Sequence, residues 1–154
     1  MHIRPATPAD LKGALAVYKS ARASMCKSGN PNQWGDSFPP RELVEQDIST
    51  GALRVCVDEN DEVLGYIFCI LIDHSVDSAR CPNKELYIDD LCVDEKCRHE
   101  GIGDALFKKA LETAKELGCH DLTLNVWEGN DSALRFYEKH GMKIQKREME
   151  IVLD

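Results

Sequence analysis

One stretch constrains the fold more than any other, because an apolar run, a glycine turn and an amphipathic helix follow one another in it without a break. The run LYIDDLCV (Leu86–Val93) is typical of a strand. The turn CRHEGIG follows, and from Ile102 to about Leu117 apolar residues recur at helical spacing until Gly118 ends the helix. The sequence therefore predicts a strand–turn–helix unit in this part of the chain.

The turn carries the pattern Arg98-x-x-Gly101-x-Gly103. Glycine lets the backbone approach a ligand closely, and the first turn of a helix presents unpaired N–H groups and a partial positive charge. The turn therefore suits a pyrophosphate, with Arg98 adding a charge-assisted contact. It is not a P-loop, because no Gly-Lys-Ser/Thr follows, and Leu106 stands where a dinucleotide fingerprint needs its third glycine. The alternative, which the sequence leaves open, is a strand–helix turn that uses glycine only for its geometry and binds no ligand.

Length and composition narrow the class of protein. The 154 residues predict one domain, the net charge is −8, and the pI near 5.1 argues against a nucleic-acid partner. No apolar run is long enough for a membrane helix, and the first residues contain no apolar signal core. The odd number of cysteines and the lack of a C-x-x-C pair favour a reducing cytoplasm without a structural metal. The cysteines are Cys26, Cys56, Cys69, Cys81, Cys92, Cys97 and Cys119.

The remaining elements follow from hydrophobic period and turn residues. Thr7, Pro8 and Asp10 mark a helix start, and Asn130 or Asp131 caps a later helix. The order β-α-α-β-β-β-α-β-α-β predicts one α/β domain with a mixed, mostly antiparallel sheet and about four helices. The expected strands are residues 2–5, 52–58, 63–72, 86–93, 121–126 and 142–153, and the expected helices are residues 7–28, 41–48, 102–117 and 130–141.

A second motif follows the glycine turn at a fixed distance. It combines the strand DLTLNV with Asn130, Ala133, Phe136, Tyr137 and Gly141 in NDSALRFYEKHGM. The two motifs together resemble the GCN5-related N-acetyltransferase (GNAT) family over about residues 85–153, nearly half of the chain. The first half fits the order of elements in that family without a sharp motif.

The resemblance implies the GNAT fold and acetyl-CoA as co-substrate, with no metal. In the family the turn wraps the pyrophosphate, and the strand before it pairs with the pantetheine arm. The helix of the second motif, through Asn130, Ala133 and Tyr137, belongs to the same site. The positions that match the turn and the strand here are Leu91, Cys92, Val93, Arg98, His99, Glu100, Gly101, Ile102, Gly103 and Asp104.

The resemblance also implies amine attack on a thioester, in which Tyr137 matches the family's general acid. The alternative for Tyr137 is a core aromatic beside Phe136. Three acids on one strand are candidates for the base, ranked Asp89, Asp90 and then Glu85. Neighbouring strand residues point to opposite faces, so only one of the adjacent pair faces the site unless a bulge intervenes. The pattern around them looks like that of the polyamine acetyltransferases.

We therefore expect an N-acetyltransferase that acts on a primary amine of a small molecule or peptide. A non-catalytic acyl-CoA-binding domain of the same fold is the alternative. The acids favour a cationic acceptor, and Trp34 and Phe38 either anchor their loop or line the acceptor pocket. A homodimer is possible through the last strand, and neither nucleic acid nor membrane is an expected partner.

Overall fold

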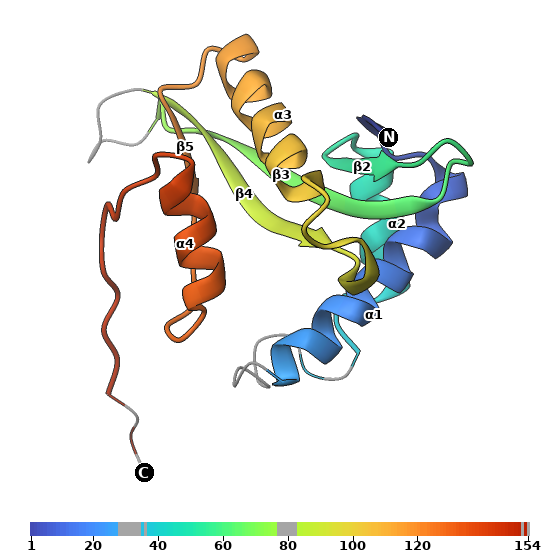
Figure 1. Cartoon of the computed structure of the whole chain (residues 1–154). Helices are drawn as coiled ribbons and strands as arrows, with labels where there is room; N and C mark the ends of the chain where they lie inside the picture. Colours follow the sequence, from blue (N-terminus) through green and yellow to red (C-terminus); the bar gives the residue numbers. More distant parts are fainter. Residues whose placement is uncertain (28–34, 36, 77–82, 152, 154) are drawn as a thin grey trace.

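A five-stranded mixed sheet forms the centre of the molecule in the computed structural model, which describes residues 1–27, 35, 37–76, 83–151 and 153 (Figure 1). The strands lie in sequence order across the sheet. The first four pair antiparallel, whereas the fourth and fifth run parallel. They are β1 (His2–Pro5), β2 (Leu53–Val57), β3 (Val63–Asp73), β4 (Lys84–Val93) and β5 (Asp121–Leu124).

Helices cover both faces of this sheet. Figure 1 shows α1 and α2 on one side, α3 on the other, and α4 beside β5. Short 3₁₀ turns η1 (Pro8–Asp10) and η2 (Glu95–Cys97) lead into α1 and into the glycine turn. The helices are α1 (Leu11–Lys27), α2 (Arg41–Ser49), α3 (Ile102–Glu116) and α4 (Asp131–Lys139).

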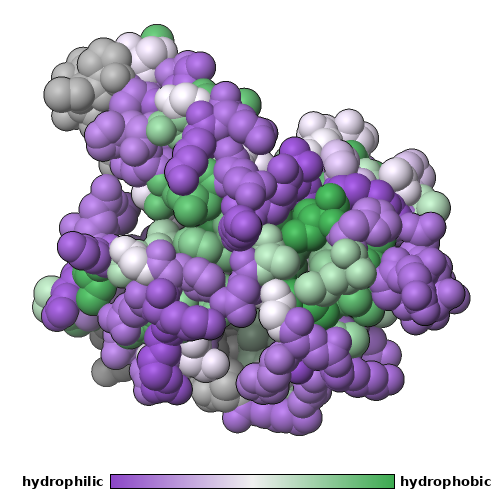
Figure 2. Space-filling model, turned by 45° about the horizontal axis from the view of Figure 1, so that its top comes forward, coloured by the Kyte–Doolittle hydropathy of each residue, from purple (hydrophilic) through white to green (hydrophobic). Residues whose placement is uncertain are grey.

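Two hydrophobic cores result, one on each face of the sheet. Along β2, Leu53, Val55 and Val57 join the core under α1 and α2, whereas Cys56 joins the core under α3. This follows from strand geometry, since successive side chains point to opposite faces. Hydrophilic residues cover most of the outer surface seen in Figure 2. Of the helices described, none is both long and apolar enough to cross a membrane.

The expected α/β domain with a mixed sheet is confirmed, but the expected strand over residues 142–153 is wrong. Its described residues, 142–151 and 153, belong to no helix or strand. Met142 packs against the core under α3, but the apolar side chains after it find no surface on the body, since Ile144 is 59% exposed and Met149 93%. The strand expected over residues 121–126 ends at Leu124, and the last helix is shorter by one residue at its start and two at its end.

An ion pair joins β1 to the start of α1. Two nitrogens of Arg4 contact the carboxylate of Asp10 at 2.7 and 2.9 Å, and the backbone N–H and hydroxyl of Thr7 also donate to it. These bonds complete the capping box that the sequence predicts. The bond from Arg4 outweighs the opposing effect of burial and lowers the pKa of Asp10 from 3.8 to about 2.

Replacing Asp10→Asn is expected to destabilise the fold by about 2–3 kcal/mol at pH 7, because the buried partner of Arg4 loses its charge. The lowered pKa means that this stabilisation is full above about pH 4 and is lost as the pH falls towards 2. Urea unfolding at pH 7 and pH 2.5 measures both effects. The control is Asp61→Asn, which removes an exposed contact with Arg4; an equal loss in both variants contradicts the prediction.

Candidate active site

A β-bulge in β4 organises the candidate site. In the pairing of β3 with β4, Phe68 lies opposite Asp90 while the next residue, Cys69, lies opposite Ile88. Asp89 is therefore an extra residue without a partner position on β3. A bulge of this kind re-aims the side chains that follow it and is common beside active sites.

The bulge changes which face the residues of β4 present. Ile88 packs in the core under α3, and so do Leu91 and Val93, although they lie an odd number of positions further along the strand. The bulge absorbs this change of parity. Cys92 packs against the core under α1 and α2. Both Asp89 and Asp90 consequently line one cavity on the α1 and α2 side, which a regular strand would not allow.

The sheet also opens at this bulge. β5 pairs with β4 only from Glu85 to Ile88 and ends at Leu124. From Asp89 to Val93, β4 therefore has β3 on one side and no pairing with β5 on the other. Such an edge offers N–H and C=O groups that an amide-containing chain can match as an added strand.

The cavity beside the bulge holds about 200 Å³ and combines acids with aromatic rings. Three carboxylates reach it, two from β4 and one from α2. Aromatic faces and carboxylates both attract cations, so the cavity suits a positively charged group of a small ligand. Its lining residues are Tyr18, Phe38, Pro39, Leu43, Asp47, Phe68, Asp89 and Asp90.

The pKa values of all three acids of the cavity are raised by burial, and those of Asp47 and Asp90 also by repulsion from neighbouring carboxylates. Burial is the main cause that raises the pKa of Asp90 to about 7, and the charges of Asp89 and Asp47 add to it. Burial also raises the pKa of Asp89, and burial together with the charge of Asp89 raises that of Asp47. Asp90 is thus poised to take up or release a proton near neutral pH.

Tyr137 lies on the inner side of α4, facing the opened part of the sheet. Its ring is 6.0 Å from that of Phe107 and 5.1 Å from that of Phe136, so it belongs to the core under α3. Burial raises the pKa of its hydroxyl, and the charges of Cys92 and Asp90 are close enough to raise it further. Tyr137 is therefore a core aromatic whose hydroxyl stays protonated at neutral pH.

The glycine turn presents backbone N–H groups at the start of α3. Gly101 caps the helix in the left-handed conformation with φ of 80°, and the first helical bond runs from the Ala105 N–H to the Gly101 carbonyl at 3.0 Å. The N–H groups of Ile102, Gly103 and Asp104 therefore precede the helical ladder. A Cβ at Gly103 would lie 3.4 Å from the ring of Phe136, which is an ordinary van der Waals contact, so the turn lies directly against α4.

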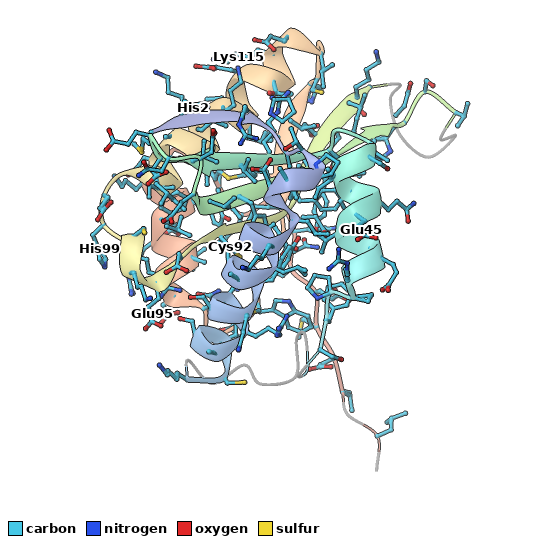
Figure 3. The ribbon with its side chains drawn as sticks, turned by 90° about the vertical axis from the view of Figure 1, so that its right-hand side faces the viewer. His2, Glu45, Cys92, Glu95, His99 and Lys115 are labelled. Atoms are coloured by element: carbon cyan, nitrogen blue, oxygen red, sulfur yellow. The ribbon has the colours of Figure 1, made fainter. Side chains whose placement is uncertain are left out.

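The other charged residues of the turn have different surroundings. Arg98 donates to the hydroxyl of Ser24 at 3.0 Å, which joins the turn to α1. His99 and Glu100 are exposed, and Figure 3 shows His99 at the edge of the molecule, whereas Cys92 lies near its middle. The carboxylate of Asp104 contacts Lys139 at 3.1 Å and His140 at 2.7 Å, so it points to the end of α4.

Two other expected site residues make structural contacts. Glu85 lies outside the cavity lining, accepts from the hydroxyl of Thr123, and contacts His74 at 2.9 Å. Asn130 caps α4 by accepting from the Ala133 N–H at 3.2 Å. Among the residues described, His, Cys, Asp and Glu nowhere gather in threes that could hold a metal.

Sequence reasoning missed one acid of the cavity, Asp47. Its signal is the stripe Leu43, Val44, Asp47 and Ile48, which puts a carboxylate on the inward face of α2. Phe38 was expected either to anchor its loop or to line a pocket, and the structure shows it in the lining of the cavity. Trp34 lies outside the described residues.

Comparison with known proteins agrees with this geometry. The model of the acetyltransferase (GNAT) family matches residues 16–142. A solved structure of the BH1408 protein from Bacillus halodurans superposes with a TM-score of 0.88 at 28% identity, covering 99% of this chain and all of the other. The chain belongs to the GNAT acetyltransferase family, and it is an acetyltransferase of the GNAT type.

Two further relatives carry names for an activity. YwnH of Bacillus subtilis (strain 168), a candidate phosphinothricin acetyltransferase by name, is 28% identical over 92% of this chain and 83% of its own. The peptidyl-lysine N-acetyltransferase YjaB of Escherichia coli (strain K12) is 30% identical over 69% of this chain and 59% of its own. Both are named for acetyl transfer, as the family requires.

Replacing Asp89→Asn is expected to lower the pKa of Asp90, because one of the two repelling charges disappears. The pKa stays above 3.8, since burial is the largest cause of its rise. Carbon-detected NMR titration of the aspartate carboxyl groups measures this. The control is Asp131→Asn on the outer side of α4, which leaves the titration unchanged. An Asp90 pKa that does not move on Asp89→Asn contradicts the coupling.

Proposed function

We propose that this protein transfers the acetyl group of acetyl-CoA to a primary amine of a small cationic molecule. The observation that carries the proposal is the cavity at the bulge of β4. It brings Asp47, Asp89 and Asp90 together beside the opened edge of the sheet. A non-catalytic acyl-CoA-binding domain has no use for a carboxylate with a pKa near neutrality at that point.

The residues present fit acetyl-CoA on two counts. The start of α3 offers unpaired N–H groups around Gly101, where a side chain would occupy the space of a phosphate. The edge of β4 from Asp89 to Val93 offers hydrogen-bonding groups to the amides of the pantetheine arm. When bound, acetyl-CoA supplies a thioester, whose carbonyl carbon accepts a nucleophile and whose thiol departs. We place its pyrophosphate at residues 98–104, with Leu91, Cys92 and Val93 along the arm.

Asp90 takes the proton from the acceptor. An amine attacks only as the neutral base, so the ammonium must lose a proton before the new C–N bond forms. With a pKa of about 7, Asp90 accepts that proton near neutral pH. Asp89 and Asp47 keep the site negative and hold the remaining positive charge of the acceptor. Glu85 has no part in this step, because it is held by Thr123 and His74.

Tyr137 supplies a proton to the sulfur of the leaving thiolate. As the C–S bond breaks, its electron pair goes to sulfur, and the hydroxyl of Tyr137 protonates that sulfur. The raised pKa of Tyr137 keeps the hydroxyl protonated until this moment. Its position beside Cys92, at the opened edge, puts it on the α4 side of the slot, opposite the acids.

The acceptor is a small amine with more than one positive charge. Three carboxylates converge on about 200 Å³, a volume suited to a slender chain, and the rings of Tyr18 and Phe68 line it. The names of the relatives span a candidate phosphinothricin acetyltransferase and a peptidyl-lysine acetyltransferase. Both acceptors are primary amines, and the charge of this cavity favours a diamine or polyamine over an amino acid. A cytoplasmic location stays a prediction.

The test is product formation from acetyl-CoA with a panel of polyamines, aminoglycosides, amino acids and short peptides, followed by mass spectrometry. The expected product is a monoacetylated polyamine. Thiol-reactive dyes are unsuitable because the chain has seven cysteines. If acetyl-CoA binds but stays intact with every amine, the domain senses acyl-CoA instead. If only peptides are acetylated, the cavity is not the acceptor site.

Replacing Gly101→Ala is expected to weaken acetyl-CoA binding at least about tenfold, because the methyl group stands among the phosphate-binding N–H groups. Gly118→Ala is the matched control. Both glycines have positive φ, 80° and 67°, both have open space at the Cβ position, and they lie at opposite ends of α3. Isothermal titration with acetyl-CoA compares them. Equal affinities in the two variants would remove the turn from cofactor binding.

Replacing Tyr137→Phe is expected to lower kcat about 10²-fold, because the thiolate loses its proton donor, with little change in acetyl-CoA affinity. Steady-state kinetics from pH 6 to 10 measures this with the acceptor that the panel identifies. In the native enzyme kcat/KM rises as Asp90 loses its proton near pH 7. The control Phe136→Leu removes the neighbouring ring and leaves the Tyr137 hydroxyl in place; unchanged turnover in Tyr137→Phe would exclude the acid role.

A further inference from the structure

Side-chain hydrogen bonds join β4 to β5 directly before the two strands separate. Tyr87 points to the face that α1 and α2 cover, because its neighbour Ile88 packs in the core under α3 on the other face. The side-chain amide of Asn125 donates to the Tyr87 hydroxyl at 3.1 Å. We call this bond the Tyr87–Asn125 bridge. A second bond, from the hydroxyl of Thr123 to Glu85, lies one step further from the opening.

The hydrophobic core closes the other face of the sheet at the same place. Ile88 and Leu124, the last residues that pair between β4 and β5, both pack in the core under α3. Beyond them β4 keeps its unpaired edge from Asp89 to Val93. The opening between the two strands therefore has a closed end. That end is formed by two core side chains on one face and by the Tyr87–Asn125 bridge on the other.

The proposed reaction puts the acyl group at this closed end. The start of α3 follows the Val93 end of β4, so a thioester whose phosphates lie there has its sulfur on the Val93 side. Its carbonyl carbon must lie beside Asp89 and Asp90, where the acceptor amine is held. The sulfur, the oxygen and the acyl chain lie in one plane around that carbon, and an amine attacks perpendicular to the plane. The acyl chain consequently points away from Val93, towards the closed end.

The ring of Tyr87 lies at the boundary between the closed end and the acid cavity. Burial raises the pKa of Tyr87, and the charge of Asp89 raises it further, so the hydroxyl is close to that carboxylate. The ring belongs to β4, while Asn125, which holds its hydroxyl, directly follows β5. An acyl chain that extends past this point must displace the ring from the bridge or separate the last paired residues of the two strands.

We infer that the Tyr87–Asn125 bridge limits the length of the acyl group, so that the protein accepts acetyl-CoA and rejects butyryl-CoA. The inference rests on the proposed function, because it needs the acyl-CoA site beside the bulge. It adds selectivity for the acyl donor, which the acid cavity does not determine. A single methylene group in an apolar pocket changes kcat/KM by about 10–200-fold. Two additional carbons at a closed end therefore suffice for a strong preference.

Two variants test the inference by opening the closed end. Asn125→Ala removes the bond that holds the ring and changes an exposed residue outside the strands, whereas Tyr87→Ala removes the ring itself. The native protein is expected to favour acetyl-CoA over butyryl-CoA at least about 10²-fold in kcat/KM, and each variant is expected to lower this ratio at least about tenfold. Steady-state kinetics with the acceptor that the panel identifies measures the ratio.

The matched control is Thr123→Val, which removes the other side-chain bond between the same two strands and keeps the size of the side chain. Its ratio is expected to equal that of the native protein. Circular dichroism shows that each variant keeps its fold, and Asn125→Ala alone decides the test if Tyr87→Ala unfolds. A ratio that falls equally in Thr123→Val and Asn125→Ala would assign the effect to loosening of the strands and overturn the inference.

Isothermal titration with acetyl-CoA and butyryl-CoA gives a second readout that needs no acceptor. The native protein is expected to bind acetyl-CoA at least about tenfold more tightly, and Asn125→Ala is expected to remove this preference. If the native protein uses or binds both donors equally, or if Asn125→Ala keeps the native preference, the inference is wrong although acetyl transfer stands. If the preference behaves as expected but no amine is acetylated, the inference holds and the proposed function fails. If neither donor binds, both are overturned.

Discussion

The pairing of β3 with β4 is the interaction on which the rest of the structure depends. It contains one residue too many on β4, and this extra residue, Asp89, decides what the end of the strand presents. Before Asp89, β4 pairs with β5. After Asp89 the two strands separate, so that β4 has an unpaired edge. The same bulge brings two neighbouring carboxylates to one cavity. The unpaired edge of β4 and the acidic cavity thus come from one local irregularity.

Much of this fold follows from hydrophobic period and turn chemistry. The five strands observed were all expected, and the glycine turn does begin a helix. The bulge can also be detected in the sequence. The apolar residues Leu86 and Ile88 stand at even positions, whereas Leu91 and Val93 stand at odd positions. Two acids stand where the parity changes. Hydrophobic spacing therefore locates the irregularity, although it does not tell which of the two acids is the extra residue.

Other features depend on contacts that spacing does not encode. Asp47 reaches the cavity because α2 packs against α1 and β2 on the face of the sheet where the cavity lies, and a helix sequence does not specify its neighbour. The alternation after Met142 predicts a strand, and this prediction is wrong because alternation within one segment does not supply the edge that a strand needs to pair with. Residues 143–151 pair with none of the strands in the part of the chain that the structure describes.

The carboxylate of Asp104 puts a negative charge next to the glycine turn. It stands in the first turn of α3, where a negative charge favours the helix but opposes an incoming phosphate. Lys139 and His140 come from the end of α4 and hold it at 3.1 and 2.7 Å. The charge that stabilises the helix is thereby balanced by Lys139. The same contacts anchor α4, which carries Tyr137, to the first turn of α3.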